Sequence, residues 1–294
     1  MGSSRVLRFL FAVSALTLSG KAVHAQRYWH DEQGRDAVRI DAWLPFLKGD
    51  GHKFFTGAVV PSTSVRVGDG FRIEGDFPIL RAGQDYGTGG GTQSSVRIGN
   101  PYIGLRVGED DKSVSGALGI RAPVAKTAKT AIEQQAVDAA AVSNFDDFEA
   151  FVPNILTVRG TLEYRKVSPS HVLFSVKGGP SLQTNTSGDP TTDSEITFDY
   201  GVRTGYEGPR AQAAVALTGR YLITAPRSPA VCPDTGTCPA RSFDARTDHH
   251  LSASVELRPG SVRPRVTLRI PLDKLRRQTQ AGAILGLGLS IAHK

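Results

Sequence analysis

The chain has 294 residues, of which 39% are hydrophobic and only 7% aromatic, and its formal net charge is +7. This apolar content is low for a soluble protein built around one large core. Beyond residue 25 no stretch holds the roughly 18 apolar residues that a membrane helix needs, which excludes a helical membrane protein. The modest positive charge gives no indication of nucleic-acid binding.

The first residues have the pattern of an export signal. Arg5 and Arg8 precede an apolar run over residues 9–18, which is too short to span a bilayer. Small residues then stand three and one positions before a predicted cleavage between Ala25 and Gln26. We therefore predict a signal peptide over residues 1–25, whose removal lowers the formal charge to +4 because three cations leave with it.

Apolar and polar residues alternate in short runs along the remaining chain. In residues 265–270, Val266, Leu268 and Ile270 share one face, while Arg265, Thr267 and Arg269 share the other. This period of two indicates strands with one apolar face. Twelve such strands are predicted near residues 38–45, 54–67, 71–80, 96–107, 114–124, 155–167, 172–182, 196–203, 211–223, 251–258, 265–270 and 285–291.

The connections between these strands alternate in length. Those after the even-numbered strands are short and rich in turn formers, whereas those after the third, fifth, seventh and ninth strands are markedly longer. The long connections are predicted at residues 83–95, 125–154, 184–195 and 224–249. Short inner turns and long outer loops are typical of bacterial outer-membrane barrels. We predict an all-β fold, a transmembrane antiparallel up-and-down β-barrel of about twelve strands over residues 38–294, after a short periplasmic segment at 26–37.

The alternation also predicts which charged side chains face the barrel lumen. Arginines outnumber acids on this face, so the lumen should be positive. Such a lumen favours either an anion-preferring pore or an interior closed by interlocking salt bridges. The lumen candidates are Arg39, Arg72, Arg106, Arg121, Arg159, Arg203, Arg220, Arg258, Arg265, Arg269, Glu74, Asp199 and Glu256.

Two of the predicted loops have internal features. Residues 127–151 show apolar residues at helical spacing, which predicts a short amphipathic helix; we expect it at the barrel rim rather than inside the barrel, because loops usually stay at the surface. Cys232 and Cys238 are the only cysteines of a chain predicted to be exported, so they are expected to form a disulfide. The nearby residues do not provide a metal-ligand set, and no metal or other cofactor is predicted.

A catalytic site is not indicated by the sequence. His249 and His250 lie near Ser252 and Ser254, with Asp248 beside them, which are the residue types of a hydrolase. Neighbouring residues on a strand point to opposite faces, however, and no nucleophile motif accompanies them. We therefore predict that the protein is not an enzyme.

Three short segments resemble a known family. Residues 74–79 read Glu-Gly-Asp-Phe-Pro-Ile, residues 99–106 read Gly-Asn-Pro-Tyr-Ile-Gly-Leu-Arg, and residues 116–123 read Gly-Ala-Leu-Gly-Ile-Arg-Ala-Pro. Over residues 70–125 the chain is similar to the outer-membrane barrel family named for the meta-cleavage pathway of phenol degradation. The resemblance implies transport of small organic compounds and assigns no binding residue. Pro101 lacks an amide donor, which predicts a bulge there.

These observations predict a channel or transporter for small, anionic or organic solutes. Its expected partners are outer-membrane lipid, the barrel assembly machinery during biogenesis and the solute itself, with no nucleic acid and a monomeric state. The final residues lack the aromatic end that outer-membrane barrels usually have. This leaves two alternatives, a soluble β-rich binding protein of the periplasm or exterior and a closed barrel without transport.

Overall fold

The computed structural model describes residues 37–47, 56–85, 91–108, 113–187, 194–224, 247–273 and 281–292. The predicted signal cleavage between Ala25 and Gln26 lies outside these residues. The predicted disulfide between Cys232 and Cys238 also lies outside them.

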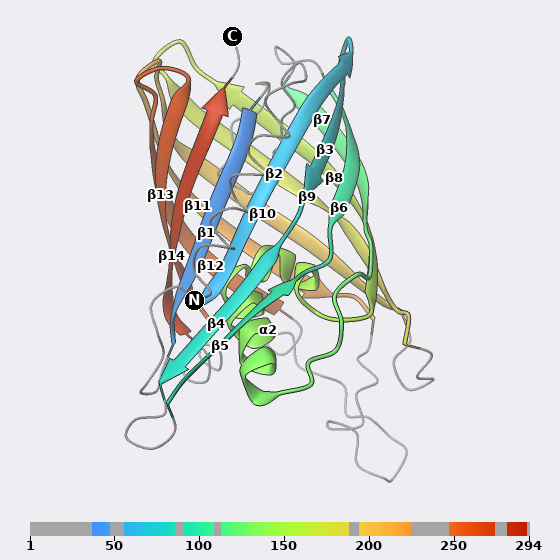
Figure 1. Ribbon diagram of the computed structural model, residues 1–294. Helices are drawn as coiled ribbons and strands as arrows, with labels where there is room; N and C mark the ends of the chain where they lie inside the picture. Colours follow the sequence, from blue (N-terminus) through green and yellow to red (C-terminus); the bar gives the residue numbers. More distant parts are fainter. Residues whose placement is uncertain are drawn as a thin grey trace.

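The described strands form one antiparallel sheet that closes on itself (Figure 1). Twelve of them form the closed ring in the order β1, β2, β3, β6 and then β7 through β14 back to β1, while β4 and β5 form a side hairpin. The predicted twelve-stranded antiparallel barrel is therefore confirmed. The strands are β1 (Ala37–Leu47), β2 (Gly57–Gly68), β3 (Phe71–Asp76), β4 (Ile79–Asp85), β5 (Thr92–Ile98), β6 (Tyr102–Val107), β7 (Val114–Arg121), β8 (Ile155–Val167), β9 (Val172–Asn185), β10 (Glu195–Glu207), β11 (Ala211–Leu222), β12 (Thr247–Leu257), β13 (Val262–Pro271) and β14 (Ala281–Ala292).

The two faces of the barrel wall differ in polarity, as β13 illustrates. Arg265 and Arg269 are 4% and 2% exposed on the inner side, while Val266 and Leu268 are 51% and 42% exposed on the outer side. A strand in lipid needs its backbone hydrogen bonds paired and an apolar side facing the lipid. The closed ladder provides the first and the apolar exterior provides the second. It excludes the soluble alternative, in which the apolar faces would pack against each other. None of the helices within the described residues has both the length and the apolar character that crossing a membrane requires.

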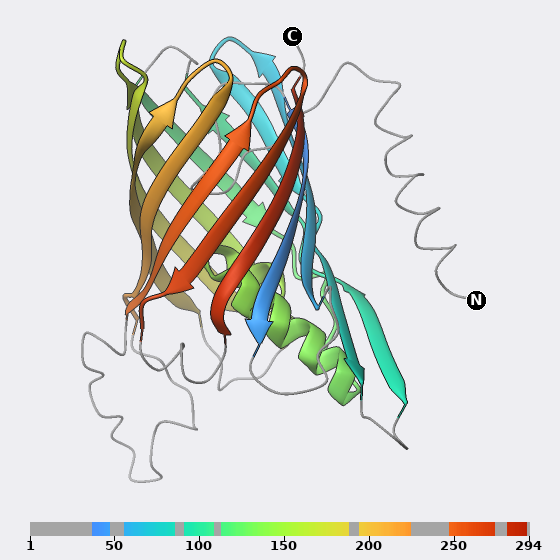
Figure 2. The same ribbon diagram turned by 90° about the vertical axis from the view of Figure 1, so that its left-hand side faces the viewer.

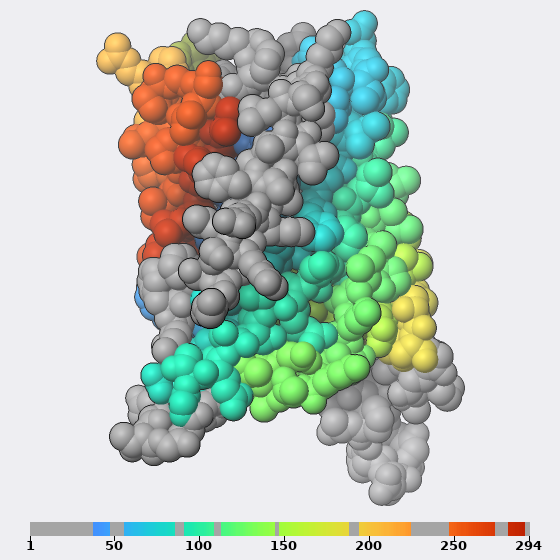
Figure 3. Space-filling view, in the orientation of Figure 1, coloured from blue at the N-terminus to red at the C-terminus, as the bar shows by residue number. Residues whose placement is uncertain are grey.

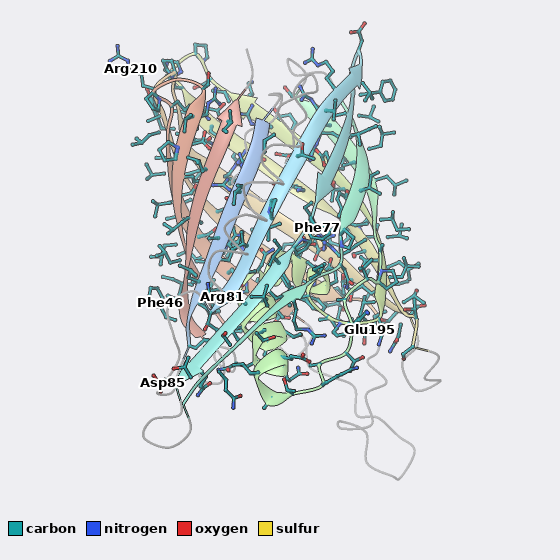
Figure 4. All side chains as sticks on the ribbon, viewed as in Figure 1. Phe46, Phe77, Arg81, Asp85, Glu195 and Arg210 are labelled. Atoms are coloured by element: carbon teal, nitrogen blue, oxygen red, sulfur yellow. The ribbon has the colours of Figure 1, made fainter. Side chains whose placement is uncertain are left out.

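The two ends of the barrel are unlike. Short connections lie at one end, here called the turn end, where Arg210 stands between β10 and β11 (Figure 4). The opposite end, here called the loop end, carries the start of β10 at Glu195 and the tip of the side hairpin at Asp85 (Figure 4). The start of β1 and the end of β14 both lie at the turn end (Figure 1).

The third and fourth predicted strands are each broken in two, and the expected bulge at Pro101 is a complete interruption. Phe77 and Pro78 separate β3 from β4, and residues 99–101 separate β5 from β6. Each interruption contains a proline, which cannot donate to the ladder. Beyond the breaks β4 pairs with β2 only through Gly57–Val59, and β5 pairs with β4. The β4–β5 hairpin therefore leaves the barrel wall (Figure 2).

The chain between β7 and β8, here called the inward segment (residues 122–154), folds into the barrel. It contains α2 (Ala131–Ser143) and the 3-10 helix η1 (Phe145–Ala150). The helix α2 lies at the loop end and packs against the β4–β5 hairpin (Figure 3), while η1 continues into the barrel, where lumen arginines bind it. The apolar face of α2 joins inward side chains of the wall in one buried cluster of Trp43, Ala58, Val60, Leu80, Ala82, Ile132, Ala136, Val137, Ala140, Ala150, Phe151 and Ile284.

The position of the Tyr102 ring in the lumen depends on two glycines that face each other on neighbouring strands. Gly104 of β6 stands opposite Gly119 of β7, and the phenol of Tyr102 lies over both of them. A Cβ atom at either position would collide with this ring. The same ring lies 5.8 Å from the Arg121 guanidinium.

We predict that Gly119→Val destabilises the barrel by about 1–3 kcal/mol, because Tyr102 must leave its place in a packed interior. The measurement is the urea midpoint of the micelle-folded protein, followed by heat-modifiable gel mobility. Gly116→Val on the outer face of the same strand is the control, since an added Cβ there lies 3.6 Å from the nearest atom, the Thr161 carbonyl oxygen. Equal midpoints for the two variants would contradict the packing described for Tyr102.

Candidate functional site

The interior of the barrel is the candidate site. The side chains predicted for the lumen lie on the buried side of their strands, or just beyond the strand end for Arg258. They are Arg39, Arg72, Arg106, Arg121, Arg159, Arg203, Arg220, Arg258, Arg265, Arg269, Glu74, Asp199 and Glu256. The structure brings several of them together through acids of the inward segment, which the alternation of strands could not predict.

Arg121, at the end of β7, stands at the junction of wall and inward segment. Its two Nη atoms bind the two oxygens of Asp76 at 3.0 and 3.1 Å, a bidentate pair. The guanidinium also binds Asp147 of η1 and donates to the Asn100 carbonyl. Arg121 is 1% exposed, so these acceptors compensate a charge that is removed from water.

Arg159 of β8 and Arg220 of β11 hold η1 from the other side. Arg159 Nη1 lies 3.1 Å from Asp147 Oδ1, and its Nη2 binds Glu149. Arg220 Nη1 lies 3.3 Å from the second oxygen of Glu149. Asp199 of β10 contacts both arginines, at 3.4 Å from Arg159 Nε and 2.5 Å from Arg220 Nε.

Two further arginine contacts reach the N-cap and the middle of η1. Arg269 of β13 donates to the Asn144 side-chain oxygen at 3.1 Å, and its guanidinium lies 4.0 Å from the centre of the Trp43 ring. The Arg220 guanidinium lies 4.7 Å from the centre of the Phe148 ring. Both distances are within the range of cation–π attraction. Arginines from four strands therefore hold η1 inside the barrel.

Asn100, in the break between β5 and β6, ties both ends of the inward segment to the wall. Its side-chain oxygen accepts from the Ala125 amide at 2.7 Å, and its Nδ2 donates to the carbonyls of Glu149 at 2.9 Å and Val152 at 2.7 Å. Its own amide donates to the Ala150 carbonyl at 2.7 Å. Asn100 is fully buried, so these bonds cannot be replaced by water without opening the site.

A helix cap and an ion pair join α2 to the side hairpin. Thr130 is the N-cap, and its hydroxyl oxygen accepts from the Glu133 amide. Glu133 accepts from the Lys129 amide at 2.6 Å and pairs with Arg97 of β5 at 2.5 Å. The Lys129 hydrogen bond, assisted by the Arg97 charge, holds the pKa of Glu133 below its ordinary value.

A second set of ion pairs lies on the strands of the wall. Arg106 binds Glu74 at 2.5 Å and lies 3.8 Å from Glu163. Arg265 binds Asp41 at 2.7 Å, joining β13 to β1 across the intervening β14. These pairs cross between strands, so they stabilise the closed ring as well as balancing charge.

The residues considered for hydrolysis divide between the two faces of β12, with His250, Ser252 and Ser254 buried on the inner side. His249 lies on the outer side, where its Nε2 is 2.7 Å from the Tyr200 hydroxyl and its amide donates to Asp273 at 2.7 Å. Ser252 is buried on the inner side and donates to the Ala216 carbonyl. Within the described ranges no group of His, Cys, Asp and Glu has the arrangement of a metal site.

A closed antiparallel barrel with an apolar exterior and a charged interior is an outer-membrane β-barrel, and the chain is a protein of the bacterial outer membrane. The fold is similar to that of the COG4313 outer membrane channel from Pseudomonas putida F1, with a TM-score of 0.53 and 10% identity over 91% of this chain and 100% of that one. The KdgM porin aligns with a TM-score of 0.46 and 9% identity, over 88% of this chain and 99% of that one. The CymD monoaromatic hydrocarbon channel aligns with a TM-score of 0.42 and 8% identity, over 89% of each chain. No family model matches the sequence, and no curated protein matches it.

Sequence reasoning missed the residues that join the inward segment to the wall. Asn100 belongs to the Gly-Asn-Pro pattern, where a polar residue between Gly99 and Pro101 signals only a turn. Asp147 and Glu149 have the appearance of a solvated helix face, although both are buried. The sequence did contain one signal for these acids. The predicted lumen has more arginines than acids, so some of its arginines need acidic partners from outside the strands.

We predict that Asn100→Ala releases the inward segment locally, because a buried amide and two carbonyls lose their partners at about 1–3 kcal/mol per group. Hydrogen exchange of the α2 amides in the micelle-folded protein should accelerate by at least about tenfold. Asn185→Ala is the matched control, since that side chain accepts a local bond from the Ser187 amide and lies outside the inward segment. Equal α2 exchange in the two variants would show that Asn100 is not the anchor.

Proposed function

We propose that this barrel is an outer-membrane channel for small anionic solutes, with the loop end outside and the inward segment as its gate. The observation that carries the proposal is the binding of two carboxylates of η1, Asp147 and Glu149, by three wall arginines. Guanidinium groups that hold carboxylates of the chain itself can also substitute for the hydration of a passing anion.

The charge of the wall supports anion preference. Apart from η1, the ion pairs of Arg121, Arg159 and Arg220 within the described residues include two wall carboxylates, Asp76 and Asp199. The resemblance to a family linked to phenol degradation favours small organic solutes. The barrel fold shared with a solved outer-membrane channel is consistent with this proposal. We expect a monomer that is inserted by the barrel assembly machinery and surrounded by lipid.

The alternative function is a closed structural barrel. It is favoured by the ion pairs that Arg159 makes with Asp147, Glu149 and Asp199, which join β8 to η1 and β10. In that case the inward segment would be a permanent part of the interior and would not move. The two functions differ in what happens when the segment loses its charges.

We predict that the double variant Asp147→Asn/Glu149→Gln raises the open probability in planar bilayers several-fold over the wild type, with a reversal potential that indicates anion preference. The reason is that the charge-assisted bonds holding η1 become neutral and weaker. Asp138→Asn/Glu195→Gln is the control, because it removes the same number of charges outside the arginine cluster; Asp138 binds Gln134 on the exposed side of α2.

Both double variants must show the same shift in gel mobility on boiling as the wild type. This result establishes that each variant folds into the barrel. Folded protein that gives no discrete current steps, in either the wild type or the Asp147→Asn/Glu149→Gln variant, would establish the closed barrel instead.

A further inference from the structure

We propose that the arginine cluster that binds η1, here called the seat (Arg121, Arg159 and Arg220), is a binding site for dicarboxylate solutes. The solute displaces Asp147 and Glu149 from these arginines. This inference rests on the proposed channel and names its substrate class. The inward segment then acts as an internal competitor of the solute.

The two acids occupy the seat as one dicarboxylate would. Asp147 bridges Arg121 and Arg159, and Glu149 bridges Arg159 and Arg220. Each carboxylate therefore contacts two guanidinium groups, and Arg159 receives one oxygen from each acid. Asp147 and Glu149 are 4% and 0% exposed, so both negative charges are enclosed by the site.

The backbone of η1 is distorted in a way that serves this arrangement. In a regular 3-10 helix of three residues per turn, side chains two positions apart diverge. Asp147 has non-helical angles, with φ −147° and ψ 37°. This kink allows Asp147 and Glu149 to meet the same row of arginines. Phe148, which lies between them in the sequence, packs its ring over Arg220, so an apolar group lies against one of the guanidinium groups that bind the two acids.

Two of the three arginines, Arg121 and Arg220, also have a close partner on the wall. Asp76 holds Arg121 in a bidentate pair. Asp199 binds Arg220 through Nε and lies 3.4 Å from Arg159 Nε, while Nη atoms of both arginines contact η1. Because Asp76 and Asp199 belong to the wall, Arg121 and Arg220 keep a close partner when η1 leaves, and such preorganisation favours binding.

The number of guanidinium donors favours a dicarboxylate over a monocarboxylate. The three guanidinium groups bind both carboxylates of η1, so they have donors for two anionic groups. A solute with two carboxylates restores the charge that η1 provided. A monocarboxylate leaves one pair of Nη donors without an anion in a buried place, which is unfavourable.

Trp43 provides a readout of binding that does not depend on current. Its ring contacts Arg269, which binds Asn144 at the start of η1. Departure of η1 changes the surroundings of Arg269 and therefore the fluorescence of Trp43. The chain has two tryptophans, so a Trp29→Phe background isolates this signal.

The experiment titrates glutarate, and acetate at equal ionic strength, into the micelle-folded Trp29→Phe protein and its variants. We expect a saturable fluorescence change with glutarate only. In the Asp147→Asn/Glu149→Gln background, glutarate should bind at least about tenfold more tightly, because the internal competitor is weakened. The Asp138→Asn/Glu195→Gln control should bind as the parent does. Arg159→Gln added to the weakened background should abolish the gain.

The outcomes separate this inference from the channel itself. Glutarate binding without current would retain the dicarboxylate site and overturn the channel. Current without glutarate binding, or with equal effects of glutarate and acetate, would retain the channel and overturn the dicarboxylate site. Unchanged glutarate affinity in the Asp147→Asn/Glu149→Gln background would also overturn it, because competition by η1 predicts a change.

Discussion

The constraint on which the structure depends is that guanidinium groups buried inside a lipid-surrounded wall must each have acceptors. Removing an ion from water costs several kcal/mol, and only close, well-directed partners offset that cost. The wall supplies part of this compensation through pairs such as Arg106 with Glu74 and Arg265 with Asp41. It supplies too few acids around Arg159 and Arg220, and the inward segment provides the remainder. The position of η1 is thus a consequence of lumen charge.

The inward segment can reach these arginines because the wall is interrupted beside it. Pro78 and Pro101 break two strands at neighbouring positions, and the β4–β5 hairpin separates from the ring on the loop-end side of these breaks. The space that results admits α2, whose small apolar face packs against the hairpin and the inner wall. Asn100 then fastens both ends of the segment at the break itself. One local interruption therefore creates both the entrance and the anchor of the segment.

The parts of this structure that depend on strand periodicity could be predicted from sequence, and the parts that depend on distant partners could not. The alternation in β13 identifies Arg265 and Arg269 as inward because a strand has a fixed period of two. The inward position of α2 has no such local signal, since Ala136 and Ala140 are suited equally to a surface and to a core. Glu149 contacts Arg220, which lies 71 residues away in the sequence. Only the closure of the sheet brings them together.

The wall of the barrel is held together differently at its two ends, because β5 pairs with β4 and with no other described strand. At the turn end each strand of the ring is joined to its neighbours by backbone ladders, which yield only when several bonds break together. At the loop end, β5 meets the inward segment through side chains instead, as when Arg97 donates to the Thr127 carbonyl. Side-chain bonds can exchange singly with water. The circumference is therefore rigid at the turn end and extensible at the loop end, so this barrel can widen at one end while its closed ring keeps the other in shape.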